Sequence, residues 1–327
     1  MYYQVRHVTQ FRYSARVRES AMEVRMQPRR EGRQQCLSFE LTTKPSARIM
    51  SREDYLGNVV HHFGIPAGHT ELVITAQSLV ALMPAAPLPH RLDSTAWDRL
   101  DGLVADSDVA EMLVPSQFAH PTPLLRELTR ELSLERRDDP LTVLREITRS
   151  VHQTLLYMPE STKVDSPIDD ALRQRRGVCQ DFTHIMIALV RELAIPCRYV
   201  SGYLYRLHRD RETTGASATH AWAEALLPDL GWVSFDPTDN VVVADRHIRT
   251  AVGRDYADVP PTRGVFKGEA ETELSVAVQV VPADETLAPD AFQRSTVPFQ
   301  SGPEADQPQQ QQQTRSGCLS LVLPRQA

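Results

Sequence analysis

Three side chains that could together perform nucleophilic catalysis stand in three short segments of the sequence. Cys179 lies in GVCQD, His220 in THAW and Asp236 in FDPT. An imidazole can take the proton of a thiol, and a carboxylate that accepts from the other ring nitrogen fixes the tautomer that allows this. The three residues therefore predict acyl transfer through a thioester, with Cys179 as nucleophile, His220 as its activating base and Asp236 as the group that orients the imidazole.

Cys179 is expected at the start of a helix. Apolar residues follow it at helical spacing until Pro196. The unpaired N–H groups and the positive end of the dipole at a helix N-terminus stabilise a thiolate. For the same reason the backbone N–H of Cys179 is expected to donate to an oxyanion. The hydroxyl of Tyr157 is an alternative donor, although a tyrosine that ends a core helix is the simpler interpretation.

His220 and Asp236 are expected on neighbouring strands of a hairpin. Polarity alternates on both sides of PDLG (228–231), which is typical of a turn. If Ala225 faces Gly231, His220 directly faces Asp236, with Cβ atoms roughly 4.5 to 5.5 Å apart. A slip of one residue would place the two side chains on opposite faces of the sheet, so the predicted site depends on the length of this loop.

Two further residues share the predicted face of His220. Trp222 is expected either to wall the substrate cleft or to pack as a core aromatic. Glu224 has no charge partner that the sequence identifies. The polar segment 206–218 precedes the histidine strand and is a candidate for the entrance to the site.

These segments and their flanks resemble the transglutaminase-like superfamily of bacteria. The matching runs are RRGVCQDF (175–182), CRYVSGY (197–203), THAWAE (219–224) and GWVSFDPT (231–238). In these papain-related thiol enzymes the nucleophile comes first along the chain, then the histidine, then the aspartate. The resemblance extends to the N-terminal region and to 245–261, and it covers about residues 1 to 283.

The resemblance implies an α+β fold, in which a papain- or transglutaminase-like core packs its nucleophile helix on an antiparallel sheet, beside an N-terminal all-β module. It implies an enzyme that acts on peptide or protein amides without a cofactor. Hydrolysis, as by a protease or amidase, is favoured because water is the default acceptor unless a site excludes it. Cross-linking of glutamine side chains to amines is the alternative. A non-catalytic peptide-binding module with a decayed site is disfavoured, because all three residues are present.

The composition is that of a globular chain with one or two domains. Of its 327 residues, 41% are hydrophobic, and the net charge of −6 comes from interspersed charges that do not favour a nucleic-acid surface. The start of the chain lacks a signal-peptide core, and no apolar run reaches the roughly 18 residues of a membrane span. We therefore expect a cytoplasmic protein with no membrane partner, of undetermined oligomeric state.

Metal and disulfide sites are not predicted. The cysteines at positions 36, 179, 197 and 318 have neither the spacing of metal ligands nor that of disulfide pairs. This agrees with a reducing compartment. Cys36 and Cys197 are expected to be packing residues. His61 and His62 are adjacent on a predicted strand, so they point to opposite faces and do not suggest a metal site.

The order of predicted elements suggests four parts. Residues 1–83 predict an all-β module, 84–122 a linker that begins with repeated prolines, 123–262 the transglutaminase-like core and 284–327 a disordered tail. Within the core, helices are expected over 124–134, 141–156 and 168–175. A strand over 273–281 is expected to return to the N-terminal module, because a lone strand leaves its ladder unsatisfied.

Overall fold

The N-terminal β module consists of two sheets that share one apolar core. The computed structural model describes residues 1–106, 109–206, 219–283 and 311–315. One sheet has the order β15-β1-β6-β3 and contains β1 (Tyr2–Val17), β3 (Gln34–Lys44), β6 (His69–Leu82) and β15 (Thr272–Ala283). The other has the order β16-β14-β2-β5-β4 and contains β2 (Glu19–Val24), β4 (Met50–Glu53), β5 (Val59–Ile65), β14 (Thr262–Lys267) and β16 (Gln311–Arg315). Phe11 and Ile74 from the first sheet pack with Met22 and Phe63 from the second.

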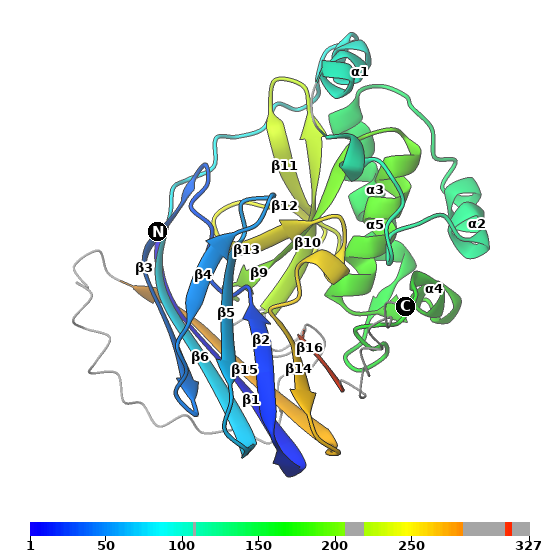
Figure 1. The fold of residues 1–327 in the computed structure, drawn as a ribbon. Coiled ribbons are helices and arrows are strands. Elements are labelled where there is room, and N and C mark those ends of the chain that lie inside the picture. The colour runs from blue at the N-terminus through cyan, green and yellow to red at the C-terminus, as the bar shows by residue number, and fades with distance from the viewer. Residues whose placement is uncertain (107–108, 207–218, 284–310, 316–327) are drawn as a thin grey trace, which may run out of the picture.

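Two strands of this module, β14 and β15, follow the core in the sequence. β15 pairs with β1 from Tyr2 opposite Ala283 to Tyr13 opposite Thr272, and β14 pairs with β2. The strand expected over 273–281 lies within β15. Figure 1 shows the orange β14 and β15 beside the blue strands of the N-terminus. The intervening chain is therefore an insertion between the early and late strands of one β module.

Segment 84–122, which we expected as a linker, carries helical structure. It contains α1 (Ala96–Asp106) and the short 3-10 helix η1 (Ala110–Met112). Leu100 of α1 is fully buried in the core, so this segment packs on the core as well as connecting to it. The expected tail, 284–327, lies outside the described residues except for 311–315, which form β16 parallel to β14.

The core is a five-stranded sheet covered by helices on one face. The sheet has the order β12-β11-β10-β9-β13 and contains β9 (Cys197–Leu204), β10 (Thr219–Leu227), β11 (Gly231–Asp236), β12 (Val241–Val242) and β13 (His247–Gly253). Helix α5 (Cys179–Glu192) packs on β10 and β9, and the alanines at 221, 223 and 225 of β10 face it in one apolar cluster. The β module lies on the other side of this sheet (Figure 1).

The remaining helices surround α5. They are α2 (Pro123–Glu131), α3 (Pro140–Thr154) and α4 (Ile168–Gln174), close to the expected ranges. Asp139 caps α3 by accepting from the backbone N–H groups of Leu141 and Thr142, at 3.0 and 3.2 Å. Among the residues that the structure describes, no helix combines the length and apolar character that a membrane crossing requires.

Gly202 of β9 lies between β10 and β13 at a position with no room for a side chain. It lies opposite His220 on β10 and opposite Arg249 on β13. A Cβ there would overlap the carbonyl oxygen of Ile248 and lie 2.6 Å from Cη2 of Trp222. We expect Gly202→Ala to lower the free energy of unfolding by about 1–3 kcal/mol, as overpacking does in a filled core. Urea denaturation measures this.

Gly102→Ala is the matched control for that substitution. Gly102 lies inside α1, and a Cβ there meets nothing within 4 Å. Alanine at a helix-interior position should stabilise the protein by up to about 1 kcal/mol. Unfolding free energies that shift alike in the two variants would contradict the close packing described at Gly202.

Candidate active site

Cys179 is the first residue of α5, and its position is held by the carboxylate of Asp181. Asp181 Oδ2 accepts from the backbone N–H of Val178 at 2.8 Å and from the hydroxyl of Thr162 at 2.6 Å. Burial raises the pKa of Asp181 to about 6 despite these two hydrogen bonds. A Cβ at Gly177 would lie 2.8 Å from Asp181 Cβ, so the glycine allows this close packing. Cys179 itself is 8% exposed.

The chain leading to Cys179 is paired with the segment that carries Tyr157. The short strands β7 (Leu156–Tyr157) and β8 (Arg176–Gly177) run parallel, with Tyr157 opposite Gly177. The backbone N–H of Met158 donates to the carbonyl of Gly177 at 2.9 Å. Tyr157 therefore lies on the strand beside the nucleophile turn and is partly exposed, rather than closing a core helix.

The hairpin brings His220 and Asp236 together, although the predicted register is wrong. Leu227, not Ala225, pairs with Gly231, so every partner moves by two residues. The turn is shorter than we expected, because Asp229 and Gly231 adopt positive φ angles of 62° and 68°. A shift of two keeps both side chains on one face. His220 is then a diagonal neighbour of Asp236, and its Nε2 lies 2.7 Å from Asp236 Oδ2.

The carboxylate of Asp236 is fully buried and accepts four hydrogen bonds. Oδ1 accepts from the backbone N–H groups of Thr238 and Asp239, at 2.9 and 3.2 Å. Oδ2 lies 2.7 Å from His220 Nε2 and 3.0 Å from His247 Nε2. Burial opposes the charged form, but the charge of His220 and the hydrogen bonds from both imidazoles hold the pKa of Asp236 below its usual value. The group is an ionised carboxylate.

His220 links this carboxylate to the thiol. Its Nε2 is bound to Asp236, which leaves Nδ1 for Cys179, and a side-chain hydrogen bond joins His220 to Cys179. Burial alone would lower the pKa of His220, but the charge and hydrogen bond of Asp236, followed by those of Cys179, raise it to about 10. His220 is therefore an imidazolium at neutral pH. The structure brings all three predicted residues into one chain of contacts.

His247 was not identified by sequence reasoning, although its segment, 245–261, was part of the family resemblance. It lies at the start of β13, which pairs with β9 on the side away from β10. The sequence signal for it is a histidine at the first position of a strand that belongs to the same sheet as His220 and Asp236. Its proximity to Asp236 depends on strand order and register, which are long-range properties.

Trp222 and Glu224 occupy the face of β10 opposite α5. Trp222 is fully buried and packs against His220 and His247, with ring centroids 6.3 and 5.1 Å away. Together with His247 it forms part of the lining of a cavity of about 880 Å³ between the sheet and the β module. Neither Cys179 nor His220 lines this cavity. Trp222 therefore packs behind the site rather than beside the nucleophile.

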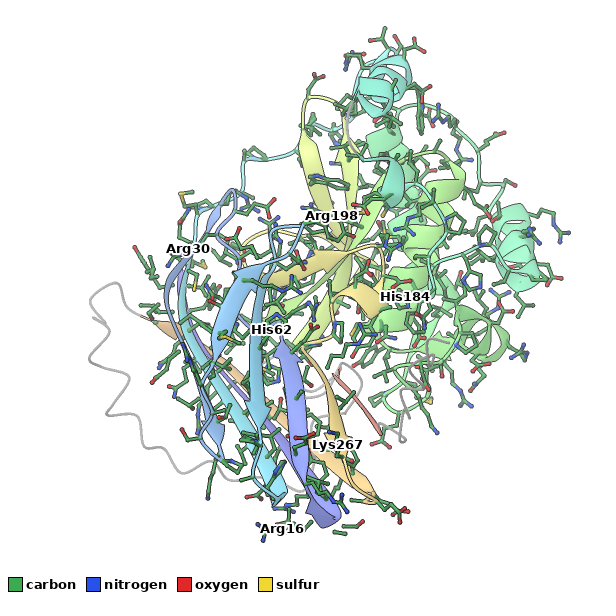
Figure 2. All side chains as sticks on the ribbon, in the orientation of Figure 1. Arg16, Arg30, His62, His184, Arg198 and Lys267 are labelled. Carbon is green, nitrogen blue, oxygen red and sulfur yellow. The ribbon has the colours of Figure 1, made fainter. Side chains whose placement is uncertain are left out.

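Glu224, for which the sequence suggested no partner, is the centre of a buried charge network. Its carboxylate accepts from Arg198 Nε at 2.8 Å, Arg249 Nη1 at 3.0 Å and Ser234 Oγ at 2.7 Å. Burial raises its pKa, but the two guanidinium charges outweigh this and lower it. Arg198 also reaches Glu31 of the β module, at 3.6 Å, and Figure 2 labels it beside that module. The network links strands β9, β10, β11 and β13.

The other cysteines and His184 fit a packing role. Burial raises the pKa of the Cys197 thiol to about 12 and also raises that of Cys36, so both are neutral thiols. Cys318 lies outside the described residues. His184 stacks on Phe118 with ring centroids 5.3 Å apart, and burial lowers its pKa to about 3. Figure 2 shows His184 on the α5 side of the sheet.

Comparison with known proteins fits this arrangement. Residues 3–81 match the bacterial transglutaminase-like N-terminal region, and residues 126–237 match the transglutaminase-like superfamily. An uncharacterised protein of Mycobacterium leprae is 33% identical over 278 residues, which cover 84% of this chain and 96% of the relative. The chain belongs to the transglutaminase-like superfamily.

The transglutaminase-like fold is also seen in a crystal structure of 22% sequence identity. That protein, from Cytophaga hutchinsonii and proposed to be a cysteine protease, superposes with a TM-score of 0.68 and covers 88% of this chain and 92% of its own. The expected α+β fold, a transglutaminase-like core with an N-terminal all-β region, is confirmed. The protein-glutamine gamma-glutamyltransferase of Pseudomonas aeruginosa is 30% identical over 132 residues. These residues cover 37% of the chain described here and 19% of that relative.

Proposed function

We propose that this protein is a cysteine-dependent enzyme that cleaves amide bonds of peptides or proteins through a thioester. The observation that supports this most is the buried chain of contacts from Cys179 through His220 to Asp236, with 2.7 Å between His220 Nε2 and Asp236 Oδ2. A thiol, an imidazole and a carboxylate in this order are the elements of nucleophilic acyl transfer.

In the proposed reaction, the proton of the Cys179 thiol passes to His220, whose raised pKa favours the imidazolium form. The Cys179 sulfur attacks the carbonyl carbon of the amide, and the carbonyl oxygen becomes an oxyanion. His220 Nδ1 then donates its proton to the departing nitrogen as the C–N bond breaks, which leaves a thioester and a neutral amine or ammonia.

The second half of the reaction regenerates the enzyme. His220, now neutral, takes a proton from water while the water oxygen attacks the thioester, and the thiolate leaves with a carboxylic acid as product. Asp236 holds the ring and stabilises its cationic form throughout. The backbone N–H of Cys179, at the N-terminus of α5, is the proposed oxyanion donor, and the Tyr157 hydroxyl on the adjacent strand is a second.

Transfer to an amine is the second candidate. It is favoured by the 30% identity, over part of the chain, to a protein named as a protein-glutamine gamma-glutamyltransferase. In that reaction a primary amine takes the place of water and forms a new amide with the glutamine side chain. Hydrolysis remains the first proposal, because transfer needs a site that binds the amine and excludes water.

Incubation with a library of glutamine-containing peptides and a labelled primary amine separates the two reactions. We expect release of ammonia or of peptide fragments without net incorporation of the label, and neither product with the Cys179→Ala variant. Label attached to glutamine without hydrolysis would overturn hydrolysis in favour of transfer. Identical products from the wild type and Cys179→Ala would contradict both candidates.

A further inference from the structure

A second imidazole contacts the same carboxylate oxygen that orients His220. His247 Nε2 lies 3.0 Å from Asp236 Oδ2, and the imidazole is buried. Trp222 packs edge-on against this ring, with centroids 5.1 Å apart and an interplanar angle of 78°. The proposed reaction does not use His247, so its contact with Asp236 needs another explanation.

The two imidazoles on Asp236 differ in charge. Burial lowers the pKa of His247, and the positive charge of His220 lowers it further, while Asp236 and the more distant Asp239 act in the opposite direction. His247 is therefore neutral where His220 is cationic. Because Asp236 is an acceptor only, a neutral His247 must carry its proton on Nε2 to donate to it. Its Nδ1 is buried without a hydrogen-bond partner among the described residues.

Hydrogen bonding explains this cluster better than a bound metal ion. One ligand atom from each of His220, Asp236 and His247 lies within 4.8 Å of the others, which would in principle allow a metal ion. Two ligands at zinc-to-nitrogen distances in a tetrahedral site would be about 3.3 Å apart. The observed nitrogen-to-oxygen distances of 2.7 and 3.0 Å are those of direct, charge-assisted hydrogen bonds.

We propose that His247 is a positioning residue that fixes the Asp236 carboxylate, and through it His220, for reaction with Cys179. Together with the backbone N–H groups of Thr238 and Asp239, it supplies three neutral donors that hold the carboxylate in place. The one remaining direction is occupied by His220. This inference rests on the proposed function, since it concerns the same reacting groups.

The test compares two substitutions of His247 in the full-length protein. His247→Leu removes the donor, whereas His247→Gln retains an N–H group near the position of Nε2. The rate of Cys179 alkylation by iodoacetamide at pH 7 should fall roughly 10- to 100-fold in the leucine variant, the range that corresponds to the loss of one hydrogen bond to a charged group. The glutamine variant should remain within about threefold of the wild type, because the donor to Asp236 is restored.

His7→Leu is the matched control. His7, in β1 of the β module, is another fully buried histidine whose pKa burial lowers to about 3, and its Nδ1 lies 3.0 Å from the hydroxyl of Tyr203 in β9. It makes no contact with Asp236, so its replacement should reduce the melting temperature without changing the alkylation rate of Cys179. If His7→Leu lowered the alkylation rate of Cys179 as much as His247→Leu, the lower rate would reflect lost stability alone. That result would overturn the proposal.

Other outcomes are equally decisive. The positioning role would be contradicted if Cys179 of the His247→Leu variant were alkylated at the wild-type rate. It would also be contradicted if a folded His247→Gln variant were alkylated as slowly as His247→Leu. If the leucine variant does not fold, the nitrogen NMR spectrum of the wild type still tests the proposal. It should show His247 protonated on Nε2 alone, and protonation on Nδ1 alone would contradict it. A wild-type Cys179 that does not react with iodoacetamide faster than Cys36 would instead remove the proposed function itself.

Discussion

Replacing Cys179 by alanine should abolish amide cleavage, with a loss in kcat of roughly 10⁴-fold or more, as for other nucleophiles of acyl-transfer enzymes. Alanine removes the sulfur that forms the thioester and leaves the helix start and the Asp181 contacts unchanged. The measurement is turnover of the best amide from the peptide library, together with mass mapping after iodoacetamide treatment. In the wild type, Cys179 should be modified before Cys36 and Cys197.

Cys197→Ala is the matched control for that variant. Cys197 is fully buried, and its raised pKa keeps it a neutral thiol, so the same change of atoms there should lower stability and leave turnover intact. Equal labelling of the cysteines, together with no amide turnover by the wild type, would favour a non-catalytic binding module over an enzyme.

Asp236→Asn should cost roughly 10³- to 10⁴-fold in kcat, although the side chain keeps its size. Four N–H donors surround the carboxylate, two on each oxygen. An amide presents one acceptor and one donor group, so either orientation sets its NH₂ against two other donors. Asparagine can therefore neither hold the His220 ring in place nor stabilise its charge.

The same variant should move the pH dependence of the site in a defined direction. A pKa of His220 raised from 6.5 to about 10 means that its imidazolium stabilises the folded state below about pH 6.5, and that this stabilisation is lost as the pH rises through about 10. The negative charge of Asp236 is the main influence that raises this pKa. Amide cleavage needs the proton of His220 for the departing nitrogen, so without Asp236 the alkaline limit of turnover should shift to lower pH.

Asp239→Asn is the matched control for both effects. Asp239 lies three residues further along the chain and pairs with Arg206 at 3.5 Å, with 22% of its side chain exposed. Its substitution should change kcat by less than about threefold, because a partly exposed ion pair contributes little. A change as large as that of Asp236→Asn would show that local charge, rather than the four-donor geometry, determines the activity.

Local patterns in the sequence predicted the parts of the site that depend on neighbouring residues. The apolar spacing after Gly177 placed Cys179 at the start of a helix, and α5 begins there. The alternation around PDLG placed His220 and Asp236 on one face of a hairpin, and they share that face. Both features follow from the period of the secondary structure, which a sequence displays directly.

The parts that failed depend on distant residues or on single backbone angles. The register moved by two because Asp229 adopts a left-handed conformation that the sequence allows but does not require. The partners of Glu224 come from three other strands, so no local pattern reveals them. The sequence analysis also missed the role of Asp181, although an acidic residue at the third position of a helix is a local signal of an N-terminal cap.

The return of β14 and β15 to the N-terminal strands determines the order in which the chain can fold during synthesis. β1 cannot complete its sheet until Thr272–Ala283 has left the ribosome, whereas all five strands of the central sheet are synthesised before Thr262. The helical core can thus fold first, while the earliest strands wait with open edges that could pair with other chains. A nonsense mutation just after Gly253 would leave the core nearly whole and the β module permanently incomplete.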